Sequence, residues 1–466
     1  MSEKIDTIRR QDRFQQKKPQ KKEATMQRLS FKLSALVGVI GFVCLGCDSE
    51  SCDCSRLAAD GGEGECIEVT DRDAGTNTDI YIDTESDTDD IDVDTDTDTE
   101  TDSSDADLPD KGIPFELSNV EIDSPSSQVI GDVIFSESSC AHYAKIDTDS
   151  CSVKCIDIDE AACAIATQSD GTEVAVLFAR AFSIDEDIQV NIEGQRPLVV
   201  IASAEVNIRG GLIALDTIIN KNGHAGGYSG NRVAGSDGNG PGGGGGSYGN
   251  GGAGGGGYCG AGGAGGQESE GAQPHGESGA ANGTVEIVPL KGGSAGGTHA
   301  FGEGGAGGGA VQIVSGMSIA VHPLGIISMP GNGGSANSGG GGGSGGTILL
   351  EAPKIEIVGV LAANGGGGGA GCGSPSCEGI HGQPDDSAAP GGISTKSANG
   401  GNGSAGDSVN GAPGESHTQN DDDTGGGGGA AGRIRINTSD GTADITGTIS
   451  PSISTGCASI GTLHEN

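Results

Sequence analysis

One short phrase recurs along the chain between long runs of glycine. Its copy at residues 346–365 predicts three short β-strands, which we place at Ile348 and Leu350, at Ile355 and Ile357, and at Val360 and Leu361. Similar phrases begin at residues 196, 309 and 432. Because side chains alternate along a strand, we expect one set of side chains in the core, namely Ile348, Leu350, Ile355 and Ile357. We expect the other set to face outward or towards a packed insertion, namely Thr347, Leu349, Lys354 and Glu356.

Repeats of this kind indicate stacked units, since a single phrase is too thin to bury its own apolar face. Three short strands per repeat, without helical periodicity, predict an all-β fold, a parallel β-helix or solenoid, over residues 196–466. The phrases alternate with glycine-rich insertions, which lie at 222–282, 291–308, 331–346 and 364–431. These insertions leave the repeat at the same corner. Their backbone forms either loose loops or adjoining polyglycine helices, and the pattern does not separate the two.

Composition supports a narrow repeat core rather than a large globular one. Among 466 residues there are 91 glycines, no tryptophan and only 33% hydrophobic residues. Glycine loses more backbone entropy on folding than any other residue, so the glycine runs argue against a conventional packed globule. The formal charge of −40 argues against nucleic acid as a partner, because its phosphates need basic patches.

The N-terminal region reads as a targeting signal covering residues 1–46, with Met26 as the better start. A short apolar run at 33–45 is too short to span a bilayer as a helix. The sequence Val-Cys-Leu-Gly-Cys at 43–47 resembles a bacterial lipoprotein signal, with Cys44 where leucine is usual. The resemblance implies that Cys47 carries the lipid. The alternative is an ordinary secretory signal cleaved nearby.

Two polar segments follow this signal. Residues 47–70 form a cysteine-bearing spacer beside the anchor, and residues 71–110 form an Asp/Thr-rich stretch that cannot collapse and is predicted to be a disordered linker. A calcium loop would need a glycine at position six and a glutamate at position twelve, and the acidic stretch has neither in place. We therefore predict no metal and no cofactor.

Residues 111–195 are expected to form a small β module that caps the first repeat. Four cysteines within it, an even number, are candidates for two local disulfides with three possible connectivities; they are Cys140, Cys151, Cys155 and Cys163. Cys372 and Cys377 are candidates for a small disulfide loop. Cys259 and Cys457 have no local partner in the sequence.

Catalytic motifs are missing from the sequence. No phosphate-binding loop or zinc-protease motif is present, and Gly-x-Gly-x-x-Gly means little in so glycine-rich a chain. Enzymes on β-helices that cleave polysaccharides need clustered carboxylates on one face. The strand-borne polar residues are few and alternate as a solvated face would; they are Glu205, Asn207, Arg209, Glu351, Lys354, Glu356, Arg433 and Arg435. We therefore predict no catalytic residue.

Taken together, these phrases resemble the glycine-rich surface lipoproteins of delta-proteobacteria. The resemblance rests on the signal, the Asp/Thr linker, Gly-Gln-Arg-Pro-Leu at 194–198, Gly-Gly-Thr-Ile-Leu-Leu-Glu-Ala at 345–352 and Ala-Ala-Asn-Gly-Gly at 362–366. Single repeats are similar to those of filamentous-haemagglutinin-type adhesins. The resemblance implies an architecture and says almost nothing about activity.

We expect a non-enzymatic, lipid-anchored protein of the cell envelope, at the outer membrane or cell surface, with a structural or adhesive role. Its expected partners are the membrane, through Cys47, and glycans or other cell-surface proteins, but not nucleic acid. The alternative is a polysaccharide lyase or hydrolase built on the same β-helix.

Overall fold

The computed structural model describes residues 112–120, 131–140, 142–155, 162–214, 224–268, 274–300, 302–336, 339–417 and 424–465. The chain divides into two compact units, Met1–Thr99 and Glu100–Asn466, and all described residues belong to the second. The signal region 1–46, the spacer 47–70 with Cys47, and the linker 71–110 lie outside the described residues. Within the described ranges, no helix has the length and apolar character needed to cross a bilayer.

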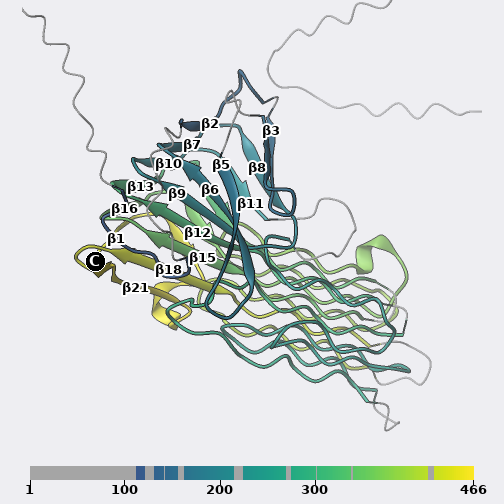
Figure 1. Cartoon of the computed structure of the whole chain (residues 1–466). Helices are drawn as coiled ribbons and strands as arrows, with labels where there is room; N and C mark the ends of the chain where they lie inside the picture. The colour runs from purple at the N-terminus through teal and green to yellow at the C-terminus, as the bar shows by residue number, and fades with distance from the viewer. Residues whose placement is uncertain are drawn as a thin grey trace, which may run out of the picture. The chain divides into compact units, whose positions relative to one another are not determined.

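The described fold is all-β, with two 3-10 turns as its helical elements, and most strands belong to three sheets (Figure 1). Sheet one contains β2 (Val133–Phe135), β7 (Phe182–Ile184), β10 (Val206–Ile208), β13 (Ser318–Val321), β16 (Lys354–Ile357) and β19 (Asp444–Ile445). Sheet two contains β3 (Tyr143–Asp147), β4 (Ser152–Lys154), β8 (Gln189–Glu193), β11 (Gly211–Ile213), β14 (Ile326–Ser328), β17 (Val360–Ala362) and β20 (Thr448–Ser450). Sheet three contains β5 (Ala162–Thr167), β6 (Glu173–Ala179), β9 (Leu198–Ala202), β12 (Ala310–Ser315), β15 (Thr347–Glu351), β18 (Arg433–Thr438) and β21 (Ala458–Thr462). The remaining elements are β1 (Phe115–Glu116), β22 (His464–Glu465), η1 (Pro375–Cys377) and η2 (Ile453–Thr455).

Each phrase contributes one strand to each sheet, in the same order. The three strands predicted at 346–365 are confirmed as β15, β16 and β17. Each of them pairs in parallel with the equivalent strand of the phrases before and after it, as Ile348 pairs with Val311 on one side and Ile434 on the other. Equivalent positions of successive phrases therefore lie side by side.

Strands of the 111–195 region continue the same three sheets. β6, β7 and β8 pair in parallel with β9, β10 and β11. At that end of sheets two and three, β4 and β5 pair antiparallel with β3 and β6 and lie at the outermost positions. Two of the three sheets therefore end in a strand that runs against the direction of the others, whereas sheet one ends in the parallel strand β2.

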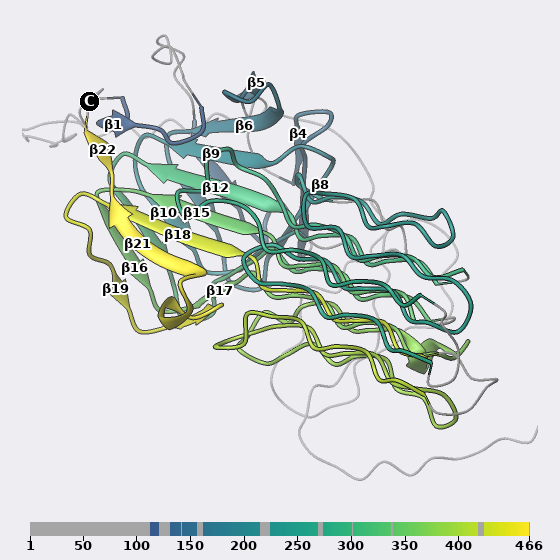
Figure 2. The same cartoon turned by 90° about the horizontal axis from the view of Figure 1, so that it is seen from below.

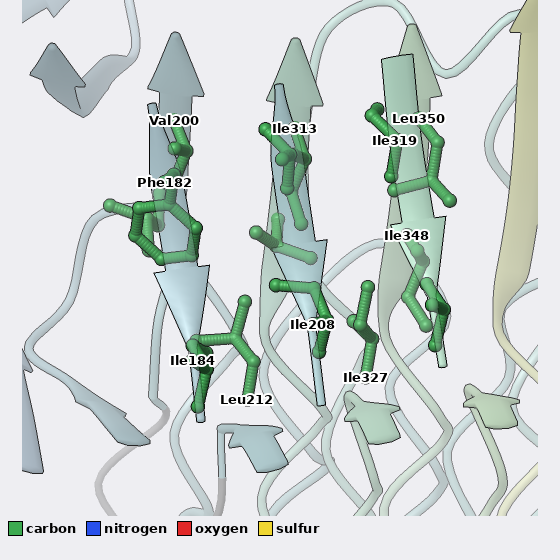
Figure 3. Close-up of a cluster of buried hydrophobic side chains, with 14 of the residues drawn as sticks. Phe182, Ile184, Val200, Ile208, Leu212, Ile313, Ile319, Ile327, Ile348 and Leu350 are labelled. Carbon is green, nitrogen blue, oxygen red and sulfur yellow. The ribbon is translucent and has the colours of Figure 1, made fainter. Parts of the chain in front are cut away.

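Alternate side chains of these strands enter two separate hydrophobic clusters. Ile348, Leu350, Ile355 and Ile357, all predicted to be core residues, are buried in the larger cluster between the sheets. Figure 3 shows how residues of successive phrases, such as Ile313 and Leu350, line up within this cluster. Lys354 and Glu356 are exposed, whereas Thr347 is buried and Leu349 enters the second cluster, on the other face of sheet three.

The second cluster exists because two segments cover the outer face of sheet three. One is residues 112–120, here called the N-terminal strap, which places Phe115 and Val120 over the sheet. The other lies between two glycine-rich insertions and contributes Ile287 and Leu290. The strap also pairs antiparallel with the last strand, Phe115 opposite Glu465, so it joins the first described residues to the last repeat.

The glycine-rich insertions join the third strand of one phrase to the first strand of the next, as β14 to β15 and β17 to β18. They extend away from the sheets as closely packed, roughly parallel segments (Figures 1 and 2). Hydrogen bonds between segments follow a period of three. Along 252–257, residues 252 and 255 donate to the 262–266 segment, residues 253 and 256 to 339–342, and residues 254 and 257 to 242–245.

The same segment accepts hydrogen bonds from three further neighbours. The carbonyls of 252 and 255 accept from the 276–279 segment, those of 253 and 256 from 427–430, and that of 254 from Gly297. One segment therefore has six bonded neighbours, and its donors repeat every three residues. Three residues per turn without internal hydrogen bonds is the geometry of an extended polyproline-II-type helix. Of the two alternatives left open above, the structure has packed polyglycine helices, which we call the glycine bundle.

Candidate functional site

Many positions in the interior of the glycine bundle have no room for a side chain. A Cβ atom at Gly255, Gly262 or Gly427 would lie less than 3.0 Å from a carbonyl oxygen of a neighbouring segment. Glycine is required at these positions because a neighbouring backbone lies within contact distance of the Cα atom. Side chains that can bind or react are consequently concentrated where the segments turn.

One group of turns lies at the end of the bundle away from the sheets, where η1 is drawn in Figure 2. We call this group the turn face, and it comprises residues 231–237, 248–250, 299–300, 302–303, 335–336, 372–378 and 394–398. Contacts link its members: Arg232 Nε lies 4.0 Å from Glu303 Oε1, and the Glu303 N–H donates to Ser335 Oγ at 2.6 Å. The turn face therefore combines residues from separate insertions.

Tyr248 is an exposed aromatic side chain of the turn face. Its hydroxyl donates to the carbonyl of Ala234 at 2.7 Å. Gly235 has a φ of +65°, and a Cβ atom there would collide with the tyrosine ring, so the ring lies directly against the Gly235 backbone. Despite these contacts Tyr248 is 54% exposed and the neighbouring Val233 is 66% exposed.

The 231–237 turn that supports Tyr248 is fixed by its own hydrogen bonds. The buried Thr298 hydroxyl donates to the Val233 carbonyl at 2.6 Å and accepts from the Ser236 N–H at 2.8 Å. The Asn231 side chain accepts from the Val233 N–H at 3.0 Å and donates to the Asp237 carbonyl at 3.2 Å. Side chains that bond their own turn in this way stabilise it locally.

A disulfide holds another turn of this face. Cys372 and Cys377 are bonded, with a Cα separation of 5.8 Å, around the 3-10 turn η1. Ile393 nearby in the chain is 63% exposed. The sequence indicated this loop because the two cysteines bracket a short polar stretch.

The cysteines of the 111–195 region are partly paired. Cys151 and Cys163 form a disulfide with a Cα separation of 5.4 Å. Of the two local disulfides predicted for these four cysteines, the structure has this one. Cys140 and Cys155 are not disulfide-bonded to each other, and the Cys140 thiol donates a hydrogen bond to the Cys155 carbonyl instead. The bond between Cys151 and Cys163 lies at the end of the repeats closed by β4 and β5.

A third disulfide joins Cys259 to Cys457, which are separated by 198 residues. Sequence reasoning found no partner for either cysteine. Cys259 lies in a turn of the first insertion, and Cys457 precedes β21 in the last repeat. Tyr258 next to it is buried, and its hydroxyl lies 2.9 Å from Thr347 Oγ1 on β15. This junction fixes the glycine bundle to the sheets.

The junction also holds a cation over an aromatic ring. The Arg433 guanidinium carbon lies 5.9 Å from the centre of the Tyr258 ring, within the range of a cation–π interaction. Arg433 also donates to the carbonyls of Asn282 and Gly283. Burial raises the pKa of the Tyr258 phenol, and the hydrogen bond to Thr347 and the charge of Arg433 oppose that shift.

The prediction that the polar residues of the strands face solvent is wrong for Glu351. It was predicted among the exposed strand residues, but it is fully buried on the outer face of sheet three. Its carboxylate accepts hydrogen bonds from Gln312 at 2.6 Å and Asn437 at 3.1 Å, which occupy the neighbouring phrases, and from Ser118 of the strap at 2.5 Å. Burial is tolerated because the charged oxygens are satisfied by these donors.

Metal-binding clusters are absent from the part of the chain that the structure describes, where no three His, Cys, Asp or Glu side chains converge. Comparison with known protein families, curated proteins and solved structures finds no match for this chain. The turn face is therefore the candidate functional site on its geometry alone.

Proposed function

We propose that this chain is a lipid-anchored envelope protein, at the outer membrane or cell surface, with a structural or adhesive role and no catalytic activity. In this proposal the three sheets are the faces of a β-solenoid, since each phrase adds one strand to each sheet in a constant order. The lipid is carried on Cys47, and the acidic segment 71–110 holds the folded part away from the membrane.

The observation that carries the proposal is the glycine bundle. Its helices are joined by backbone hydrogen bonds, which link the segment 252–257 to six neighbouring segments, and turns such as 231–237 carry exposed apolar side chains. A stable scaffold that displays loops is the usual arrangement of binding proteins. The buried carboxylate Glu351 meanwhile serves the sheet's own hydrogen bonds rather than an open catalytic groove.

The anchor is tested by replacing Cys47 with Ser. Two acyl chains hold a protein stably at a membrane, whereas the bare polypeptide has no such attachment. We expect the wild-type protein in the membrane fraction and Cys47→Ser in the aqueous fraction. Replacement of Cys52 by Ser, in the spacer and outside the signal motif, is the control, and it should leave the protein in membranes. Retention of Cys47→Ser in membranes would rule out this anchor.

Display on the cell is tested separately with intact cells. External protease or an antibody against residues 224–432 should reach the wild-type protein without lysis. Purified protein incubated with polysaccharides should release no reducing ends. Steady release of reducing ends would favour the polysaccharide-cleaving alternative over the adhesive one.

A further inference from the structure

We propose that Tyr248 and the 231–237 turn form a carbohydrate-binding platform for β-linked sugars of the gluco configuration. This inference deepens the proposed function, on which it rests, by naming a ligand class and the residues that bind it. The observations behind it are an exposed aromatic ring, a pre-formed turn beneath that ring, and polar side chains on that turn.

The ring of Tyr248 is held in one orientation while remaining open to solvent. One side of it rests on the Gly235 backbone, and its hydroxyl is fixed to the Ala234 carbonyl at 2.7 Å. Just over half of the residue is nevertheless accessible, at 54%. An aromatic face supplies a large apolar contact area. The axial C–H groups of a gluco-configured ring form a flat apolar surface that matches such a face.

Binding to this platform requires little ordering of the protein. Thr298, which is 1% exposed, holds Val233 and Ser236 through its hydroxyl, and Asp237 accepts from the Gly246 N–H at 2.9 Å. Since part of the cost of binding is the ordering of loops and side chains, a turn already fixed by these bonds loses little entropy when it binds a ligand.

The turn that supports the ring also carries polar side chains, at Arg232 and Asp237. Arg232 has a side chain that is 57% exposed, and its 4.0 Å contact with Glu303 is a weak, solvent-exposed ion pair. Its guanidinium offers several N–H donors. Asp237 is exposed on the same turn and offers carboxylate acceptors. Sugar hydroxyls both donate and accept, so this mixture suits them.

The size of the apolar surface favours a sugar over a protein partner. On the 231–237 turn and the 248–250 turn beside it, the large exposed apolar residues are Val233 and Tyr248. A stable protein interface buries about 1,600 Å² in total, far more than two side chains provide. One aromatic ring, with one valine on the turn that supports it, instead matches the face of one or two sugar rings.

The test uses the full-length protein purified in detergent and two probes, cellotetraose and chitotetraose, with sorbitol as a polyol that lacks a ring face. The chain has five tyrosines and no tryptophan, so tyrosine emission reports ligand contact directly, and calorimetry gives the affinity. We expect saturable binding of at least one tetrasaccharide and none of sorbitol. Tyr248→Ala should weaken binding by about tenfold or more, since it removes the stacking surface.

Three further variants separate this role from a structural one. Tyr248→Phe keeps the ring and should bind within about twofold of wild type. Tyr143→Ala removes another exposed tyrosine, which is 66% exposed on β3, and should bind as wild type does. Arg232→Ala leaves the ring in place and should weaken binding through lost hydroxyl contacts.

Two results would overturn the proposal: no binding of either tetrasaccharide by the wild-type protein, or equal binding by wild type and Tyr248→Ala. The measurement uses purified protein, so either result leaves the envelope assignment intact. That assignment is decided by the membrane fractionation of Cys47→Ser.

Discussion

At the scale of single residues, the informative positions are those where a polar or bulky side chain is enclosed. Glu351 was expected in solvent because a charge on an alternating strand usually faces water. It is buried because Gln312, Asn437 and Ser118 supply donors, and the sequence does not show that residues 39 and 86 positions away occupy adjacent strands. Tyr258 is another enclosed residue of this kind.

Tyr258 gives a prediction about alkaline stability. Burial raises the pKa of its phenol above the ordinary value of 10.0. The unfolded chain then loses this proton at lower pH than the folded chain does. The stability that the neutral phenol provides is therefore complete below about pH 10 and is lost as pH rises through the folded-state pKa. Denaturant unfolding measured between pH 8 and pH 11 should show this loss.

Tyr258→Phe is the matched variant. It should cost about 1 kcal/mol near pH 8, through the lost hydrogen bonds to Thr347 and Lys291, and it should flatten the alkaline decline. An equally steep decline in the Phe variant would show that other groups cause it.

At the scale of elements, the strands could be predicted from the sequence, but the conformation of the glycine-rich insertions could not. Alternation around Ile348, Leu350, Ile355 and Ile357 has a period of two, which identifies both the strands and their buried faces. Glycine carries no side chain and so gives no such pattern. The sequence of the insertions was therefore compatible with loops as well as with helices. The hydrogen-bond period of three in the bundle appears only when several segments are brought together.

A pair of substitutions tests the assignment of strand faces. Leu350→Ala should destabilise the folded chain by about 2–5 kcal/mol, as expected for a truncated core side chain. Glu356→Ala on β16 should change stability by no more than about 0.5 kcal/mol, because Glu356 is exposed. Unfolding in urea measures both. Similar losses for the two variants would be incompatible with the observed register.

At the scale of the whole described unit, distant parts of the chain are fastened together. The disulfide Cys259–Cys457 connects the first insertion to the last repeat across 198 residues, and the strap pairs with β22 at the same repeat. Neither connection follows from the sequence, since pairing of distant cysteines depends on how the repeats stack. The disulfide between Cys372 and Cys377 could be predicted from the sequence, because only a short stretch separates the two cysteines.

Cys457→Ser tests this long-range connection. Removing a disulfide that closes a long loop should cost about 2–5 kcal/mol, measured by thermal or urea unfolding. Opening of Cys372–Cys377 by the Cys377→Ser variant should cost less, because its loop is short. Equal costs for the two would mean that the long bridge does not restrain the unfolded chain as expected.

The threefold hydrogen-bond period of the glycine bundle also limits how these segments can change in length. Deleting one residue from the middle of a segment such as 252–257 would redirect every later N–H to a different neighbour. Deleting three would remove one complete turn, about 9 Å of helix at 3.1 Å per residue, and return each remaining donor to its own partner. Insertions and deletions in these segments should therefore be tolerated in steps of three residues. The change in length should be the same in a segment that runs away from the sheets and in the segment that runs back. A bundle of this type has a reading frame in its protein sequence, as a gene has in its nucleotides.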